Sequence, residues 1–447
     1  MSISLLSALF LASCLYVLHQ IRSKRNRQLP PGPKGWPILG NILELREDLP
    51  VWKIFDKMKN EYGPIVYLNF AGQNVVVLNT KEAANELLDR RSGNYSDRPK
   101  SIVGSYLGSS LVLALAGYGK TWQTMRHASH SALNMRASAE YCPGQIDDAV
   151  IFTYDLLHKT APPLTSIESF NCGLYVLRKS PLHSDDPILQ KLSHMAHRFA
   201  TALYPGAYLV EILPILDYLP SFMAKWKRDA QEDYKKFTAI FEQCFEEALV
   251  HQKDKANLSA KLAEEQASIG LTDLEKVWLP GILYLAGYET TANTLSWLLH
   301  AMTIYPSIQR KAQEEIDRVV GRSRTPTFND MEHLPYIRAV VKEILRWQPA
   351  VPFGVPHVSM EDDWYEGKYF IPKGTACFAN IWSINRSTDV YGPDALEFRP
   401  ERFLNEDGTL RNDEYNHSTY GFGRRICVGR HIADNSLFII LATVLWL

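Results

Sequence analysis

One cysteine near the C-terminus stands in a setting that favours metal binding. Cys427 lies between two arginines and an apolar, helix-like run, and three glycines share its segment: Gly421, Gly423 and Gly429. Unpaired N–H groups and the positive dipole end at a helix start, together with the two arginines, favour the thiolate over the thiol. The thiolate is the form that binds iron. A packing cysteine, the plainer alternative, would not explain three glycines, which permit tight turns and close backbone approach.

The longest helical pattern of the chain begins with a capping box. Thr272 and Glu275 form a T-x-x-E pair, and the apolar pattern then continues to Tyr305, directly before Pro306. This is a helix of about 33 residues, or roughly 50 Å. A helix of that length would cross the whole domain.

The middle of this helix carries weak helix formers. Gly287 costs about 1 kcal/mol relative to Ala, and the Thr290 hydroxyl can bond back to the carbonyl of Ala286 and bend the helix. The pattern fits either a distortion with a purpose or a tolerated kink, partly due to Pro280. This segment alone leaves both interpretations open.

Residues 420–429 resemble the haem-binding loop of the cytochrome P-450 family, F-x-x-G-x-R-x-C-x-G. Gly423, Arg425, Cys427 and Gly429 stand at the positions of that pattern. Tyr420 replaces its Phe, which keeps an aromatic ring. The resemblance implies that Cys427 is the ligand of the iron in haem b (iron protoporphyrin IX), held by a loop that includes Gly421.

Two further motifs occur in the order of the family. Glu343 and Arg346 match its E-x-x-R, and residues 400–403 resemble its P-E-R-F element. Glu343 and Arg346 lie on one helix face, so they can pair, and Arg402 can complete a buried charge network. Alone, E-x-x-R is a common surface ion pair; the order of the motifs supports a structural role.

Residues 286–290 resemble the oxygen-activation motif in the long central helix of the family. The resemblance implies that Gly287 leaves room above a haem. It also implies that the Thr290 hydroxyl holds a water beside bound oxygen, and that Glu289 relays protons inward. These two residues are the predicted catalytic pair.

The resemblance also assigns four residues to the haem propionates. They are Trp122 and Arg126, in a W-x-x-x-R pattern, together with His357 and Arg425. Trp122 and Arg126 are one helical turn apart, as two groups that grip one carboxylate must be.

The activity that the resemblance implies is monooxygenation of a lipophilic organic substrate with O2. The thiolate donates electron density to the haem iron, which favours O–O cleavage. Residues 352–355 and the loop 102–113 are largely apolar and are expected to face the substrate. Electrons would come from an NADPH-cytochrome P-450 reductase, with a docking patch of four basic residues: Lys120, Arg126, Arg424 and Arg430.

The N-terminus predicts a membrane anchor. Residues 3–21 form a run of 19 residues without Lys, Arg, Asp or Glu, and four basic residues follow: Arg22, Lys24, Arg25 and Arg27. As a helix this run spans roughly 28 Å, close to the about 30 Å of a bilayer core. Basic flanks stay in the cytoplasm, so we expect a single-pass anchor over residues 1–21 in the endoplasmic reticulum membrane, with a cytoplasmic catalytic domain. A cleaved signal peptide is the alternative, but it would carry its positive charge before the apolar run.

The charge balance and the cysteine count exclude two classes of protein. The 447 residues carry 48 Lys and Arg against 49 Asp and Glu, a balance that argues against nucleic acid as a partner. Six cysteines are too sparse for a disulfide scaffold, and four are expected to be packing residues: Cys142, Cys172, Cys244 and Cys377.

The domain organisation follows from the absence of repeats after residue 40. We expect a basic, proline-rich linker over residues 22–40 and one catalytic domain over 41–447, mainly α with small β-sheets. Helical patterns dominate, as at 221–250 and 307–320, and strand-like patterns are short: 65–70, 75–78 and 375–381.

Two observations keep other functions open. The chain ends 447 − 427 = 20 residues after Cys427, whereas the family normally continues through a β-hairpin. We therefore expect a missing C-terminal end and, as an alternative function, a catalytically impaired haem-binding protein. Six apolar residues would then lack covering partners: Phe438, Ile439, Ile440, Leu441, Val444 and Leu445. Residues 114–121 match a relaxed P-loop, A-x-x-x-x-G-K-T, after a strand-like run at 111–114. The strict form needs Gly at the first position and an acidic strand end, so nucleotide binding is a remote alternative.

Overall fold

The computed structural model describes residues 28–46, 48–158, 187–203, 207–250, 258–411 and 417–447. The predicted anchor, residues 22–27 of the predicted linker and Cys172 lie outside these ranges. Among the residues within them, none of the helices is long and apolar enough to cross a membrane.

Helices make up most of the described chain, as the sequence predicted. Their bounds are α2 (Val51–Tyr62), α3 (Lys81–Ala84), α4 (Ile102–Tyr106), α5 (Lys120–Leu133), α6 (Met135–Ser138), α7 (Cys142–His158), α10 (Pro187–Leu203), α11 (Leu209–Ile212), α12 (Lys225–Val250), α13 (Leu258–Ile269), α14 (Asp273–Ile304), α15 (Pro306–Val319), α16 (Pro335–Trp347), α17 (Ile381–Ile384), α18 (Thr388–Tyr391) and α19 (Arg430–Trp446).

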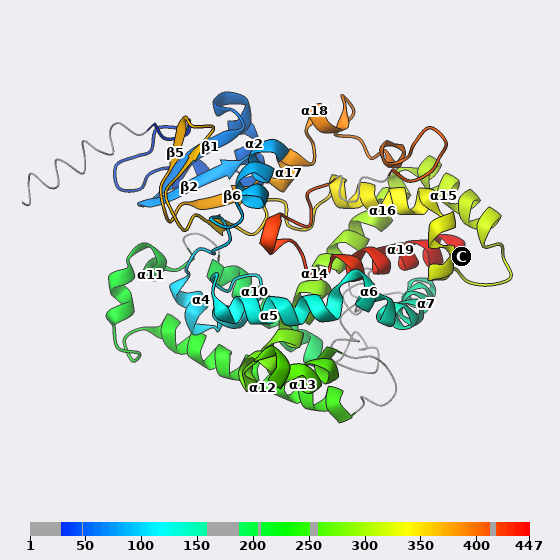
Figure 1. Cartoon of the computed structure of the whole chain (residues 1–447), viewed down its shortest axis with the longest axis horizontal. Helices are drawn as coiled ribbons and strands as arrows, with labels where there is room; N and C mark the ends of the chain where they lie inside the picture. Colours follow the sequence, from blue (N-terminus) through cyan, green and yellow to red (C-terminus); the bar gives the residue numbers. More distant parts are fainter. Residues whose placement is uncertain (1–27, 47, 159–186, 204–206, 251–257, 412–416) are drawn as a thin grey trace, which may run out of the picture.

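The strands form two small sheets that lie together at one end of the molecule (Figure 1). The larger sheet has the order β1 (Ile65–Phe70), β2 (Gln73–Leu78), β6 (Ala376–Ala379), β3 (His357–Val358). Only β2 and β6 run parallel among its neighbours. The other sheet is the antiparallel pair β4 (Asp363–Tyr365) and β5 (Tyr369–Ile371). The three strand-like patterns of the sequence are thereby confirmed as β1, β2 and β6.

Helix α14 runs through the middle of the helical part (Figure 1) and packs on α12, α13, α15 and α16. Its capping box is formed: the Thr272 hydroxyl accepts from the backbone N–H of Glu275 at 3.2 Å, and the Glu275 carboxylate accepts from that of Thr272 at 2.8 Å. Because it is covered on several sides, its buried residues do not form one stripe. Gly281 allows the closest approach, since a Cβ there would lie 2.2 Å from the Phe241 ring of α12.

Helix α19 corrects the expectation that the C-terminal apolar residues lack cover. Phe438, Ile439, Ile440, Leu441 and Leu445 are all buried. Helices α7, α15 and α16 pack against α19 and cover this face. The expectation was wrong because these helices, whose packing partners the sequence does not reveal, supply the cover.

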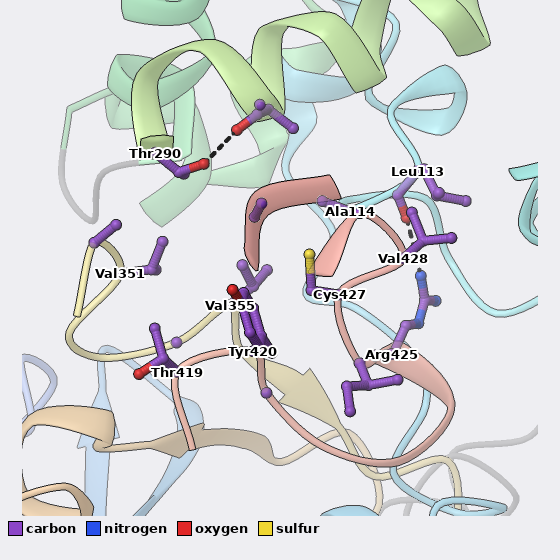
Figure 2. Close-up of a pocket in the computed structure, with 18 of the residues that line it drawn as sticks. Leu113, Ala114, Thr290, Val351, Val355, Thr419, Tyr420, Arg425, Cys427 and Val428 are labelled. Carbon is purple, nitrogen blue, oxygen red and sulfur yellow. Dashed lines mark hydrogen bonds between the residues drawn. The ribbon is translucent and has the colours of Figure 1, made fainter. Parts of the chain in front are cut away.

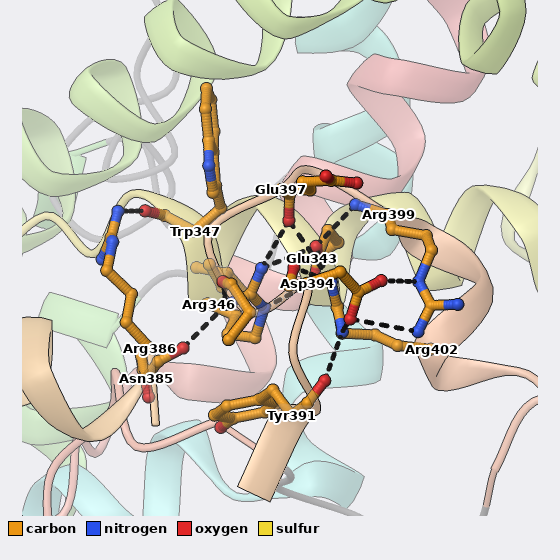
Figure 3. Close-up of polar contacts among 12 residues, drawn as sticks. Glu343, Arg346, Trp347, Asn385, Arg386, Tyr391, Asp394, Glu397, Arg399 and Arg402 are labelled. Carbon is orange, nitrogen blue, oxygen red and sulfur yellow. Dashed lines mark hydrogen bonds and ion pairs between the residues drawn. The ribbon is translucent and has the colours of Figure 1, made fainter. Parts of the chain in front are cut away.

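A buried ion network ties α16 to the segment before the cysteine loop (Figure 3). Arg346 donates two hydrogen bonds of 2.7 Å to the Glu343 carboxylate, and Arg402 Nε lies 3.1 Å from the same carboxylate. Glu343 and Arg346 have no exposed side-chain surface. Arg346 also donates to the carbonyls of Asn385, Ala395 and Glu397, which ties helix α16 to residues 385–397. The predicted charge network is therefore confirmed.

Candidate active site

The loop before α19 folds back on itself and presents Cys427. The backbone N–H of Cys427 donates a 2.8 Å hydrogen bond to the carbonyl of Tyr420, which closes the loop. Gly421 and Gly423 have φ values of +78° and +53°, in the left-handed region that favours glycine. At Gly423 a Cβ would also lie 2.2 Å from the Leu88 carbonyl oxygen. The loop can pack this closely on the backbone at Leu88 only because residue 423 is a glycine.

Cys427 opens into a cavity of about 330 Å³ that lies between this loop and α14. Its thiol is free, and its accessible surface faces the cavity. Figure 2 shows the sulfur pointing into the space below the α14 segment that carries Thr290. Within the described residues, no group of three or more His, Cys, Asp or Glu side chains is placed to hold a metal ion. The protein therefore offers one thiolate donor at this cavity.

The electrostatic setting of the thiol differs from the sequence prediction. Burial raises the pKa of Cys427, and this effect outweighs the backbone hydrogen bond from Gly429 and the positive charges of Arg126 and Arg430. The prediction of a lowered pKa was wrong because the helix start and nearby arginines do not offset the loss of water. A bound metal cation would favour deprotonation of Cys427, since coordination by a thiolate releases the thiol proton.

The opposite wall of the cavity is one stretch of α14. Ala286, Gly287 and Thr290 all line it. The Thr290 hydroxyl donates a 2.7 Å hydrogen bond to the carbonyl of Ala286, as the sequence predicted (Figure 2). A Cβ at Gly287 would meet nothing within 4 Å, so its missing side chain leaves open space. Glu289 is exposed and is not among the cavity-lining residues, and its role in a proton relay stays a prediction.

One side of the cavity is lined by two buried arginines and one half-buried arginine. Arg126 and Arg425, both predicted, and Arg98, which was not, all contribute to the lining. Burial lowers the pKa of Arg98 to about 9 and that of Arg425 to about 10, and it lowers the pKa of Arg126 as well. Within the described part of the chain, none of the three forms an ion pair with a carboxylate within 4.0 Å.

Backbone carbonyls fix two of these guanidinium groups. Arg98 donates to the carbonyls of Ala114, Val355 and Pro356 at 2.7–2.8 Å. Arg425 donates to those of Ser96, Leu113 and Ala116 at 2.8–3.3 Å; the bond to Leu113 is drawn in Figure 2. Carbonyls orient the guanidinium groups without neutralising their charge. The site is therefore prepared for an anion.

Trp122 and His357 also line the cavity. Their assignment to the haem propionates stays a prediction. The Trp122 ring centroid lies 4.1 Å from the Arg425 guanidinium carbon, a cation–π contact. His357 Nδ1 lies 2.6 Å from the Tyr95 carbonyl, which fixes the ring. Burial and the positive charges of Arg98 and Arg425 lower the pKa of His357 to about 3, so its ring is neutral at pH 7.

Arg98 is the site residue that sequence reasoning missed. It lies in a Ser-Asp-Arg-Pro stretch that resembles an ordinary loop. Its place shortly before the helix that carries Trp122 was the one sequence signal for a role at the site. Its contacts gave no signal, because the acceptors Val355 and Pro356 are 257 and 258 residues away.

The apolar part of the lining refines the predicted substrate-facing segments. Gly354 and Val355 line the cavity, and so does Leu113, but Pro352, Phe353 and residues 102–112 do not. Phe353 stacks instead on Trp52, with ring centroids 6.2 Å apart.

The relaxed P-loop match at residues 114–121 does not form a P-loop. No strand precedes it: Ser109–Leu111 is a short 3₁₀ helix, and Ala114 lines the cavity. Helix α5 begins at Lys120 and packs in the helical part of the molecule rather than behind a parallel strand. The nucleotide-binding alternative is therefore wrong, because its strand is missing.

Comparison with known proteins gives one consistent family. The model of the cytochrome P450 family matches residues 30–446. A cytochrome P450 monooxygenase of Armillaria gallica is 45% identical over 438 residues, which cover 94% of this chain and 82% of the relative. Cytochrome P450 monooxygenase 58 of Postia placenta is also 45% identical, over 97% of this chain and 84% of its own length. The monooxygenase iboC of Amanita muscaria is 38% identical, with 99% and 88% covered.

Proposed function

The chain belongs to the cytochrome P450 family of haem-dependent monooxygenases, and from this premise we propose that it oxygenates a lipophilic small molecule with electrons from an NADPH-dependent reductase. As an oxidoreductase of this family it uses haem (iron protoporphyrin IX) and O2. The observation that carries the proposal is the free Cys427 thiol, which opens into a cavity that Thr290 and three arginines also line.

The donor set around the cavity fits this cofactor. Haem carries two propionate groups, and the charges of Arg98, Arg126 and Arg425, which form no ion pair within 4.0 Å among the described residues, would neutralise them. Neutral His357 and Trp122 add hydrogen-bonding groups on the same side. Cys427 would supply the single protein ligand to the iron, and the open space over Gly287 leaves room on the other face.

When bound, the haem supplies the oxygen-activating chemistry. The residues of the chain set the conditions for it. The Cys427 thiolate would donate electron density, and the hydrogen bond from the Gly429 backbone would hold that sulfur in one orientation. The Thr290 hydroxyl, which donates to a carbonyl on its own helix, would accept a hydrogen bond from a water, and that water would pass a proton into the cavity.

An apolar substrate follows from the remaining lining. Leu113, Ile282, Val351, Val355 and Ile381 present aliphatic side chains to the cavity. Burial of such surface favours a ligand by about 25 cal/mol per Å². A lipophilic substrate with few polar groups therefore fits this wall best.

We also propose the endoplasmic reticulum membrane as the location and a membrane-bound reductase as the electron donor. The apolar run at residues 3–21 and its basic flank support the anchor. The exposed Lys120 and Arg424, with the partly exposed Arg430, support a basic docking patch on the cysteine side. Arg126, originally included in that patch, lines the cavity and belongs to the haem site.

The experiment that tests the proposal is a carbon-monoxide difference spectrum of the reduced, purified protein. We expect the red-shifted Soret band of thiolate ligation in the natural protein and its loss in Cys427→Ala. Cys142→Ala is the matched control, because this thiol is also partly accessible but lies outside the cavity. A Cys427→Ala protein that keeps the band would overturn the ligand assignment.

A further inference from the structure

Tyr420 and Asp434 form a close polar pair at the cysteine loop. The Tyr420 hydroxyl donates a 2.5 Å hydrogen bond to Asp434 Oδ1, in the first turns of α19. The carbonyl of Tyr420 accepts the backbone N–H of Cys427. Tyr420 therefore connects two parts of the site. Its backbone binds the thiol loop, and its side chain binds a carboxylate on the following helix.

The carboxylate acts electrostatically on the thiol. Burial is the main cause of the raised pKa of Cys427. The negative charge of Asp434 adds to it, against the opposite effects of the Gly429 N–H, Arg126 and Arg430. The geometric link between the two residues is Tyr420, which bonds Asp434 through its hydroxyl and the Cys427 N–H through its carbonyl.

The pKa of Asp434 lies above the usual range of a carboxyl group. Burial raises its pKa to about 6, although the Tyr420 hydroxyl lowers it. Three cationic groups act on it in the same direction as the hydroxyl: Lys342 and Arg338 from α16, and Arg430 from α19.

The hydroxyl is a feature of this chain. The haem-loop pattern that residues 420–429 resemble has Phe at the position of Tyr420, and Phe has no donor for a carboxylate. A buried acid without a hydrogen-bond donor is costly, so the tyrosine and the aspartate depend on each other.

We propose that Asp434, held by the Tyr420 hydroxyl, is a positioning residue that lowers the reduction potential of the haem iron from the cysteine side and couples that potential to uptake of a proton. This inference rests on the proposed function, because it requires Cys427 as the iron ligand. An ionised carboxylate near the thiolate favours the oxidised, more positive iron. When an external reductant supplies one electron, the local charge becomes more negative, and the Asp434 carboxylate binds one proton from solvent. One O–H bond forms and no bond breaks.

The test is a potentiometric titration of the purified, haem-loaded protein between pH 5 and 8, with dithionite, mediator dyes and the Soret band as readout. In the natural protein we expect the midpoint potential to rise as the pH falls through the titration of Asp434. A tenfold difference in proton affinity between the two redox states corresponds to about 59 mV for one electron. Asp434→Asn should have a higher potential at pH 7.5 and a flat pH profile.

Tyr420→Phe gives a second, independent arm. Loss of the hydroxyl donor should move the inflection of the pH profile to higher pH, because that donor lowers the pKa of Asp434. Asp434→Glu should restore a pH-dependent potential. Asp389→Asn, which removes an exposed carboxylate on α18, is the matched control and should behave as the natural protein.

Either of two results overturns the inference: an Asp434→Asn protein with the potential and pH slope of the natural protein, or a Tyr420→Phe protein with an unmoved inflection. If Asp434→Asn fails to bind haem, the Tyr420→Phe arm decides. Failure of the proposed function looks different, because the natural protein would then lack the thiolate Soret band before any potential is measured.

Discussion

The Thr290 hydroxyl donates its hydrogen to the Ala286 carbonyl one turn earlier on α14, and both residues line the cavity that contains the Cys427 thiol. The hydroxyl is therefore held at the helix surface with its oxygen lone pairs available toward the cavity. A water bound there would be oriented by a hydroxyl whose own hydrogen is held by the Ala286 carbonyl.

Replacement of the Thr290 hydroxyl should uncouple NADPH consumption from product formation. We expect Thr290→Ala to lower the ratio of product formed to NADPH consumed by about tenfold or more, since positioned proton donors contribute about 10²–10⁴-fold to rates. Thr290→Ser should keep most of the coupling. The measurement is product and NADPH determined in the same reaction. Thr303→Ala is the control, because Thr303 makes the same type of bond, to Leu299 at 3.0 Å, at an exposed position of α14. Unchanged coupling in Thr290→Ala would remove the proton-delivery role.

The two glycines with positive φ in the cysteine loop should differ in their tolerance to substitution. Gly423→Ala places a Cβ against the Leu88 carbonyl and strains φ, so we expect a loss of about 2–5 kcal/mol and poor haem retention. Gly421→Ala meets no atom within 4 Å and should cost about 1–2 kcal/mol, from φ alone. Thermal unfolding and haem content measured together separate the two. Equal losses would contradict the close contact with Leu88.

The sequence predicted those features that neighbouring residues encode. The capping box of Thr272 and Glu275 and the pair of Glu343 and Arg346 are each fixed within one helical turn, and both are formed. Arg98 could not be predicted, because its acceptors lie 16, 257 and 258 residues away. The pKa of Cys427 was predicted with the wrong sign for a similar reason: the helix start is local, whereas the burial that dominates comes from the whole fold.

The side of α14 on which a residue lies could also be predicted only in part. Ala286 and Thr290 are four residues apart and share the cavity-facing side, as helical periodicity requires. Glu289 is rotated about 100° from Thr290 around the helix axis, which explains its absence from the lining. Family resemblance assigned Glu289 a function, and periodicity alone would have placed it away from the cavity wall.

The buried ion network should be essential for folding. Glu343→Gln removes the carboxylate that Arg346 and Arg402 share. Arg346 then loses its buried ion-pair partner, whereas Arg402 keeps Asp394 at 3.3 Å. We expect a loss of about 3–5 kcal/mol, as for other broken buried pairs. The measurement is the urea midpoint, with haem content as a second readout. Asp229→Asn breaks the exposed pair with Lys225 and is the control, with no measurable loss expected. A Glu343→Gln protein as stable as the control would show that the network is dispensable.

His417 should make the protein sensitive to acid. Its ring is buried, and Nδ1 has no hydrogen-bond partner among the described residues. Burial and the positive charges of Lys342, Lys81 and Arg346 lower the pKa of His417 from 6.5 to about 3. The folded state therefore binds fewer protons than the unfolded state between these values. Stability contributed in this way is complete above pH 6.5 and is lost as the pH falls toward 3, by up to about 1.4 kcal/mol per pH unit.

The variant His417→Gln isolates this effect from the other titrating groups. His357 acts with the same sign, since its pKa is also lowered to about 3, whereas Asp434 acts with the opposite sign, since its pKa is raised to about 6. Both contributions are shared by the natural protein and the variant, so they cancel in the difference. We expect the urea midpoints of the two proteins to differ by a constant amount at pH 7.5 and 8.0, where His417 is almost entirely neutral in both states. Between pH 6 and 4.5 the natural protein should lose stability more steeply, so that the variant becomes relatively more stable with each step toward acid. Parallel profiles over the whole range would mean that His417 gains a proton without unfolding, and that water reaches its ring in the folded protein.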